Sequence, residues 1–319
     1  MKKILSILLV AILALSLVAC GNGGASKMTM GTGNTTGTYY GYGGILGQYI
    51  KNDAGIDVTV VSTGGSKANI QGIDAGDYQL GTVQSDVMSY AWEGTRSFEK
   101  DGKVDTFRVV AGLYAEAVQL VTMDPEIKSV KDLAGKSVSI GESGSGVYFN
   151  ALDILTAAGL KETDIKAQHQ SFSDSADALK DGKIDAAFIV AGPPTPAITE
   201  LCTTNDAHLV PIDGEIAEKL MADCPFYSLH TIPAGTYKGQ DADVTTVTVK
   251  ATLIVSAEAS EEAVYKLTAA IFDNIEAITK EHAKGAELTL ENATQGLTVP
   301  FHAGAAKYFK EKGIEVAVK

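Results

Sequence analysis

The sequence is poor in cysteine, which limits the covalent and metal chemistry open to it. Only three cysteines, Cys20, Cys202 and Cys224, occur in 319 residues, so a disulfide-rich scaffold is excluded. Outside the cytoplasm Cys202 and Cys224 could form one disulfide, but the sequence does not show whether their Cα atoms come close enough. A metal site at these cysteines is disfavoured, because no histidine or third cysteine lies at ligand spacing.

Basic residues are also scarce. The chain has 26 lysines and arginines against 39 acidic residues, a net charge of −13, and its only arginines are Arg96 and Arg108. Such an acidic chain argues against nucleic acid as a partner. It also means that an anionic ligand would have to be captured by local geometry, since the overall field repels it.

Long apolar runs are missing after the first twenty residues. Two lysines precede the run Ile4–Val18, which is too short to span a bilayer comfortably and has the layout of a secretory signal. Its end, Leu17-Val18-Ala19-Cys20, resembles the bacterial lipobox, whose cysteine becomes the lipidated first residue of the mature chain. We therefore expect residues 1–19 to be a lipoprotein signal peptide and 20–27 a flexible tether. The rest would lie outside the cytoplasm, anchored to the membrane by lipid on Cys20.

Short β-branched runs alternate with helical patterns along the remaining chain. We expect strands at 28–32, 57–62, 79–83, 107–112, 118–124, 137–141, 165–170, 185–191 and 208–212, and a long one within 244–256. We expect helices near 39–51, 66–75, 84–92, 129–133, 146–159, 174–181, 195–202, 214–222, 260–282 and 303–312. Strands separated by helices of this length indicate βαβ units and parallel sheets covered on both faces, so the fold class is α/β.

A weak internal echo indicates two lobes rather than one long sheet. The segments Ile73–Val83 and Leu179–Ile189 share a plan, in which a helix ends at a glycine and a polar turn leads into a buried strand. The plan could also be a common helix-to-strand turn that happens to occur twice. About 300 residues after the leader is nevertheless a length that suggests two lobes.

Five turns have the place and composition of a ligand site. In open α/β sheets ligands gather beyond the carboxyl ends of strands, at helix N-termini, where free N–H groups favour a negative charge. The turns lie at 31–44 (GTGNTTGTYYGYGG), 62–66 (STGGS), 84–86 (QSD), 141–146 (GESGSG) and 191–196 (AGPPTP). Any one of them alone could be ordinary helix capping. Their distribution over both halves of the chain favours one shared cleft.

Enzymatic motifs fail on the same residues. Gly31, Gly33 and Gly37 carry one residue too many for a dinucleotide fingerprint, and Gly141–Ser145 ends in serine where a serine elbow needs glycine. The histidines form no metal pair and flank no obvious nucleophile; they are His169, His208, His230, His282 and His302. We therefore expect no enzyme activity and no cofactor or metal.

A more specific signal comes from seven segments that follow one another along the chain. They are GTGNTTGTYYGYGG, STGGSKANI, LGTVQSDV, VSIGESGSG, GKIDAAFIVAGPPTPAI, IPAGTYKGQ and GLTVPFHAGAAKYF. In this order and spacing they resemble the TAXI family of TRAP-transporter solute receptors, from about Met28 to Gly313. The stretches VAGPPTPAI and IPAGTY are the most distinctive. Gly41 stands where relatives commonly have proline, next to the expected pocket.

The resemblance implies a two-lobed periplasmic-binding-protein fold of type II. One lobe would comprise 28–116 and 245–319 and the other 117–244, with two hinge strands between them. It further implies a monomer that captures a small organic acid such as glutamate, glutamine or 2-oxoglutarate. The acid would pass to a sodium-driven permease, which would be a fused multi-span protein. Two alternatives stay open, namely a lipid-anchored sensor or scavenger and, less favoured, an esterase using Ser143 or Ser145.

The expected ligand-binding residues lie in the turns and one later segment. Helix N-termini and hydroxyl groups, rather than the two arginines, would hold the carboxylates. The residues are Thr36, Gly37, Thr38, Tyr39, Ser66, Gln84, Ser85, Ser143, Gly144, Ser145, Gly146, Gly192 and Tyr227. Tyr39 could instead be a packing aromatic residue.

Overall fold

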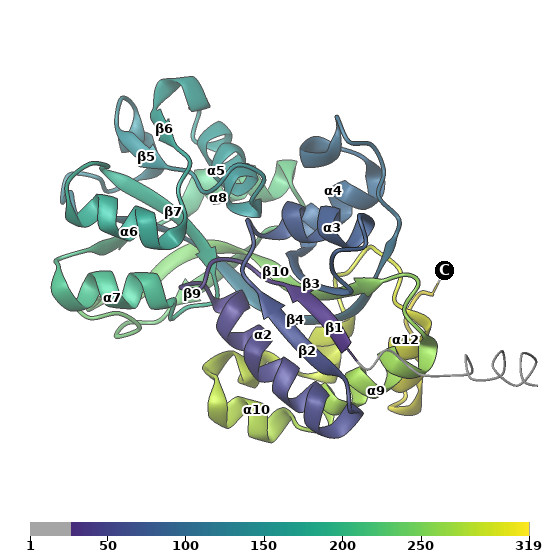
Figure 1. Cartoon of the computed structure of the whole chain (residues 1–319). Helices are drawn as coiled ribbons and strands as arrows, with labels where there is room; N and C mark the ends of the chain where they lie inside the picture. Colours follow the sequence, from purple (N-terminus) through teal and green to yellow (C-terminus); the bar gives the residue numbers. More distant parts are fainter. Residues whose placement is uncertain (1–26, 319) are drawn as a thin grey trace, which may run out of the picture.

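The computed structural model describes residues 27–318 (Figure 1). The expected signal peptide, the lipidated Cys20 and nearly all of the tether lie outside the described residues. None of the helices in residues 27–318 combines the length and the hydropathy that a membrane span requires.

The first lobe is built on three parallel strands, in the order β2-β1-β3. They are β1 (Lys27–Gly31), β2 (Asp57–Val61) and β3 (Leu80–Gln84). Between and after them run α2 (Thr38–Tyr49), which continues as the π-helical η1 (Ile50–Ala54), α3 (Ser66–Asp74), α4 (Ser85–Glu93) and the 3-10 turn η2 (Arg96–Phe98). Because a helix connects each strand to the next, the strands run in the same direction, which gives the parallel pairing that the sequence predicts.

The second lobe repeats this arrangement with β6-β5-β7, also parallel. Its strands are β5 (Ser137–Ser139), β6 (Lys166–Gln168) and β7 (Ala186–Ala191). Its helices are α5 (Gly146–Ala157), α6 (Phe172–Lys180), α7 (Pro196–Thr204) and α8 (Gly214–Asp223), with short 3-10 turns η3 (Val130–Leu133) and η4 (Glu162–Asp164). In Figure 1 these teal and green elements form a group apart from the purple and blue ones.

Two long antiparallel strands join the lobes. These are β4 (Phe107–Thr122) and β10 (Val244–Ser256), and with them all strands form one ten-stranded sheet. The internal echo suggested two lobes rather than one long sheet, but the strands of both lobes belong to a single sheet. The two strands expected at 107–112 and 118–124 form one continuous strand, β4. Glycine and alanine at 111–117 lower the strand signal there, yet the long pairing with β10 keeps the backbone extended.

β4 and β10 change partners at the middle of the molecule. Residues 251–255 of β10 pair with β3 in the first lobe, whereas 117–122 of β4 pair with β7 in the second. Two short strands complete the second lobe, β8 (His208–Val210) on β4 and β9 (Ser228–Ile232) on β10. β9 was not predicted, because most of it is exposed and polar.

The chain closes with helices packed on the first lobe. They are α9 (Glu261–Phe272), α10 (Ile275–Glu281), the 3-10 turn η5 (Ala283–Glu287), α11 (Leu290–Thr294) and α12 (Ala303–Glu311). The single helix expected at 260–282 is broken at Asp273–Asn274. The Asn274 side chain donates to the carbonyl of Ala270, which favours an end to the helix there.

The internal echo occupies equivalent positions in the two lobes. α3 and α6 each end at a glycine with positive φ, Gly76 at +83° and Gly182 at +65°. Each glycine N–H donates to a carbonyl three residues earlier, as in a left-handed helix cap. The strands that follow, β3 and β7, each lie between the central parallel strand of their lobe and a long antiparallel strand.

The two faces of the second-lobe sheet bury separate clusters, and this keeps the cysteines apart. Phe188 and Val190 point into a cluster that contains Cys224, whereas Ile189 and Ala191 point into one that contains Cys202. Alternate residues of a strand face opposite sides, so the two thiols lie on opposite faces of the sheet. The possible disulfide is therefore absent, and both cysteines are free and buried.

A thiol titration checks this placement. For a chain that begins at residue 27, we expect two thiols per molecule after denaturation. In the native protein both should react slowly, because burial raises the pKa of the Cys202 and Cys224 thiols. A denatured protein with no titratable thiol would contradict the structure.

Candidate functional site

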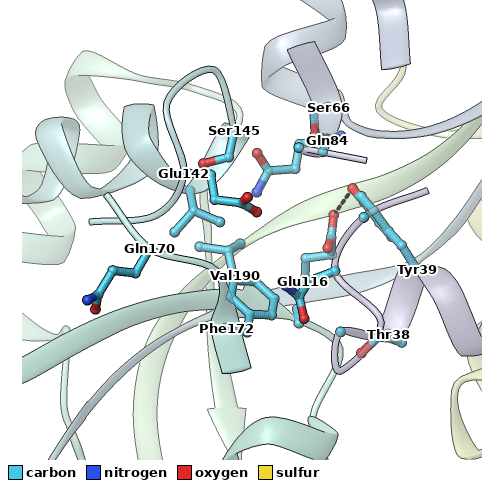
Figure 2. A pocket seen from close by; sticks show the side chains of 18 residues that line it. Thr38, Tyr39, Ser66, Gln84, Glu116, Glu142, Ser145, Gln170, Phe172 and Val190 are labelled. Carbon is cyan, nitrogen blue, oxygen red and sulfur yellow. Dashed lines mark hydrogen bonds between the residues drawn. The ribbon is translucent and has the colours of Figure 1, made fainter. Parts of the chain in front are cut away.

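A cavity lies where the two lobes meet, at the carboxyl ends of the parallel strands (Figure 2). All five turns singled out in the sequence contribute to its wall. The lining residues are Gly33, Asn34, Gly37, Thr38, Tyr39, Gly64, Gly65, Ser66, Gln84, Glu116, Glu142, Ser145, Gly146, Val147, Gln170, Phe172, Val190 and Ala191. The space between them is about 50 Å³. That is room for a few water molecules, so the site fits a small guest rather than a nucleotide.

Three helices begin at this wall and direct their N-terminal N–H groups toward it. The residues before α2 and α3 are Gly37 and Gly65, which supply no side-chain cap. α5 is capped by the Ser145 hydroxyl, which accepts from the N–H of Tyr148 at 3.2 Å. The first turns of α2 and α3 therefore keep backbone donors for a ligand, and their dipoles favour a negative charge.

Seven of the expected residues line the cavity. They are Gly37, Thr38, Tyr39, Ser66, Gln84, Ser145 and Gly146. The Thr38 hydroxyl is already used, because it donates to the carbonyl oxygen of Gly192 at 2.8 Å. The Ser66 hydroxyl accepts from the N–H of Gln84 at 3.0 Å. Both serve to fix the wall as much as to meet a guest.

The other six expected residues lie outside the wall. Ser143 is exposed and Gly144 half-buried at the tip of the 141–146 turn. The carbonyl of Thr36 accepts from the N–H of Ala197, and Gly192 is buried behind Thr38. Ser85 and Tyr227 instead line a second hollow of about 840 Å³ beside Lys250 and Glu287, which we call the rear groove.

Gly41, expected beside the pocket, is not in its wall. It is exposed on α2, and a Cβ atom added there would meet nothing within 4 Å. α2 meets the cavity with its N-terminus, where Thr38 and Tyr39 line the wall, whereas Gly41 lies one turn further along the helix. A substitution at Gly41 therefore has no direct route to ligand preference.

Two carboxyl groups in the wall were missed from the sequence. Glu116 lies in β4 and Glu142 in the turn before α5. A signal for Glu116 existed, since it is the one charged residue between Val109 and Thr122 of an apolar strand. Glu142 lies within a turn already singled out for its glycines and serines. Gln170 and Phe172, from the loop before α6 and its first turn, carried no signal of their own.

The environment of Glu116 disfavours its charge. Its carboxylate oxygen Oε2 accepts a short hydrogen bond from the Tyr39 hydroxyl, and its side chain is 2% exposed. Burial raises the pKa of Glu116 well above its usual range, and the bond from Tyr39 only partly opposes this. Burial and the neighbouring Glu116 likewise raise the pKa of Tyr39. The surroundings of Glu116 therefore favour its protonated form.

A buried polar network crosses from one lobe to the other beside the cavity. Asn150 of α5 donates to Asp86 Oδ2 at 2.9 Å and to the Tyr227 hydroxyl at 2.6 Å. Its Oδ1 accepts from Gln84 Nε2 at 2.8 Å. Burial raises the pKa of Asp86 to about 6, and nearby Asp153 adds to the shift.

An ion pair closes the edge of the same interface. Arg96 of the first lobe binds Asp153 of α5 at 2.7 Å, and its guanidinium also donates to Cys224 Sγ at 3.3 Å. Arg96 has φ +44°, the only positive φ among the described non-glycine residues. The strained backbone and the two contacts indicate that the lobes are held against each other here.

The fold is that of two-lobed periplasmic solute-binding proteins. The chain is similar to PhnD1 from Prochlorococcus marinus in complex with methylphosphonate, with a TM-score of 0.54 and 13% identity over 90% of this chain and 96% of that chain. It is also similar to a putative L-cystine ABC transporter from Listeria monocytogenes, with a TM-score of 0.51 and 19% identity over 82% of this chain and 97% of that chain. A third similar structure is the alkanesulfonate-binding protein SsuA from Xanthomonas axonopodis pv. citri, bound to MOPS. Its TM-score is 0.50, with 16% identity over 91% of this chain and 92% of that chain.

The family is shown by a match along nearly the whole described chain. Residues 30–313 match the model of the NMT1-like family, so the chain belongs to that family.

Proposed function

We propose that this protein captures a small organic carboxylate between its lobes outside the cytoplasm and delivers it to a membrane transporter. The observation that carries the proposal is the cavity at the lobe junction, because turns from both lobes and three helix N-termini meet there. A guest in this position contacts both lobes at once. Its binding therefore favours the closed arrangement over an open one.

The anion would be held by backbone N–H groups and hydroxyls. Neither arginine lies in the wall: Arg96 binds Asp153, and the Arg108 guanidinium donates to the backbone carbonyls of Asp105 and Phe107. Gly37 and Gly65 leave the first turns of α2 and α3 without side-chain caps. These donors suit a carboxylate in a protein whose overall charge repels anions.

Closure would take place by bending of β4 and β10. We place the lobes at 28–116 with 245–319 and at 117–244, which agrees with the change of partner at Ala117 in β4. In β10 the segment 244–248 still pairs with β9 of the second lobe, so its bend would fall near 248–251. Two strands are a sufficient hinge for a rigid-body movement of this kind.

The type of transporter rests on the sequence motifs. The TAXI-like segments support a TRAP-type permease, with the chain tethered through Cys20 as a monomeric lipoprotein. The likeness to a putative L-cystine ABC transporter supports an ABC-type partner as the second candidate. A lipid-anchored sensor is a third. A neighbouring gene for a fused multi-span permease would favour the first, and one for an ATPase the second.

Solute capture is favoured over hydrolysis. The Ser145 hydroxyl caps α5, and within residues 27–318 no histidine forms a hydrogen bond with it. Ser143 is exposed at the tip of its turn and outside the cavity wall. Among the described residues, neither serine therefore has the histidine partner of a serine nucleophile.

A thermal-shift screen tests the proposal. We expect at least one of L-glutamate, L-glutamine, 2-oxoglutarate and succinate to raise the unfolding temperature of the chain lacking residues 1–19. A ligand at a hundred times its Kd adds about 2.7 kcal/mol to the stability of the folded state. Failure of all four compounds at millimolar concentration would count against a small carboxylate as the ligand.

A further inference from the structure

The cavity contains a second kind of recognition element besides its helix N-termini. We infer that it selects a ligand carrying an ammonium group, which binds between the carboxyl groups of Glu116 and Glu142. The inference rests on the proposed function and narrows its ligand from small carboxylates in general to zwitterions such as α-amino acids. Three observations carry it.

The first observation is the charge of the wall. Two carboxyl groups line the cavity, and none of its described lining residues is lysine, arginine or histidine. Figure 2 shows Glu116 and Glu142 reaching into the space from opposite sides, one from β4 and the other from the turn before α5. A purely anionic guest would face both. An ammonium group would instead find an acidic partner on each lobe.

The second observation is a shortage of donors for side-chain oxygens. Gln84 Oε1 and Gln170 Oε1 belong to residues of the wall, are buried, and have no hydrogen-bond partner within residues 27–318. The direction of the Gln84 amide is fixed by its neighbours, because Asn150 must donate to the carboxylate of Asp86 and so accepts from Gln84 Nε2. The carbonyl end of Gln84 is thus left without a donor. Buried acceptors without partners are costly, and a ligand with N–H groups would satisfy them.

The third observation is that the surroundings of both carboxyl groups raise their pKa values. Around Glu116 lie Tyr39 of α2, Tyr114 of its own strand, Asp86 of α4 and Lys284 of η5; only Lys284 favours its charge by attraction. Burial also raises the pKa of Glu142, and Asp174 of α6 adds to the rise. An ammonium group between them would bring a positive charge that both lack. Binding should then lower the pKa of Glu116 and favour release of its proton to solvent.

These elements fit the two ends of one small molecule. A carboxylate would lie at the first turns of α2 and α3, and an ammonium group between Glu116 and Glu142. An oxo acid of the same length offers the carboxylate but no N–H donor. The opposite use of a protonated Glu116, as a donor to a second carboxylate, would prefer the oxo acid and release no proton.

Calorimetric titration with matched ligands separates these outcomes. We expect L-glutamate or L-glutamine to bind at least tenfold more tightly than 2-oxoglutarate and succinate. Repeating the titration in buffers of different ionisation enthalpy at pH 7 should show a net release of protons on binding. An oxo acid that binds as tightly as the amino acids, or binding without proton release, would overturn the inference and leave the proposed function standing. If none of the four compounds binds, the proposed function fails as well.

A pair of variants locates the effect. Glu142→Gln keeps the size of a half-buried side chain and should weaken amino-acid binding at least tenfold, with the unfolding temperature of the free protein little changed. Glu126→Gln removes a carboxylate from an exposed position of the same lobe and should leave binding unchanged. Equal affinities of the two variants would contradict a role for Glu142.

Discussion

Gly146→Ala is expected to weaken ligand binding by about a hundredfold or more while the protein still folds. A Cβ atom at Gly146 would lie 1.4 Å from Gln84 Oε1 and 2.4 Å from its Cδ, across the junction of the lobes. Gln84 is 2% exposed and its amide is held by Asn150, so it has little room to turn away. The methyl group would therefore keep the lobes apart, and a loss of about 3 kcal/mol in closure corresponds to a hundredfold in affinity.

The variant should fold because the position itself accepts alanine. Gly146 lies in the first turn of α5 without a positive φ, and alanine is a better helix former than glycine. Gly44→Ala is the matched control, since Gly44 is exposed on α2 with nothing within 4 Å of an added Cβ. Its affinity should equal that of the wild type. Unchanged affinity in Gly146→Ala would show that the lobes do not need this contact.

Asp86→Asn is expected to tighten ligand binding at pH 7 by up to about a hundredfold. In the closed arrangement burial holds the pKa of Asp86 at about 6, against an ordinary value of 3.8. The prediction assumes that opening exposes the carboxyl group to water and returns its pKa to the ordinary value. The closed form thus binds a proton more tightly. At pH 7, closure has to bury an ionised carboxylate, which makes the free energy of closure less favourable. Asparagine keeps the bond from Asn150 without that charge, and two pKa units correspond to roughly 3 kcal/mol.

The pH dependence gives the sign of this effect. A raised pKa in the closed form means that closure is most favourable below about pH 4 and becomes less so as the pH rises toward 6. The wild-type protein should therefore lose about tenfold in affinity from Asp86 between pH 5 and pH 7, and Asp86→Asn should not. The ratio of the two dissociation constants at each pH isolates Asp86 from Glu116 and from the ligand. A ratio that does not change with pH would contradict the account.

The fold could be predicted largely because local sequence specifies it. Alternation of β-branched runs with helical patterns gave the parallel units β1–β3 and β5–β7, and glycines gave helix ends at Gly76 and Gly182. β9 and α11 were not predicted. Each is short, and packing on β10 and β4 rather than local propensity holds it in place. The merging of two expected strands into β4 likewise depends on pairing with β10, whose residues lie 131 to 149 positions further along the chain.

The wall of the site was predictable only where function and local geometry coincide. Gly37, Ser66 and Ser145 lie at helix starts, which a sequence pattern can reveal. The cross-lobe network is different, because Asp86 and Asn150 are 64 positions apart and meet only when the lobes do. The opposite faces of one sheet likewise separate Cys202 from Cys224, and no spacing in the sequence expresses that.

The most direct test of a site shared by both lobes is a crystal structure with the screened compound that stabilises the protein most. We predict electron density in the cavity between the lobes, with a carboxylate at the first turns of α2 and α3 and contacts from α5 on the other side. A ligand bound in the rear groove, or one that touches a single lobe, would contradict the account.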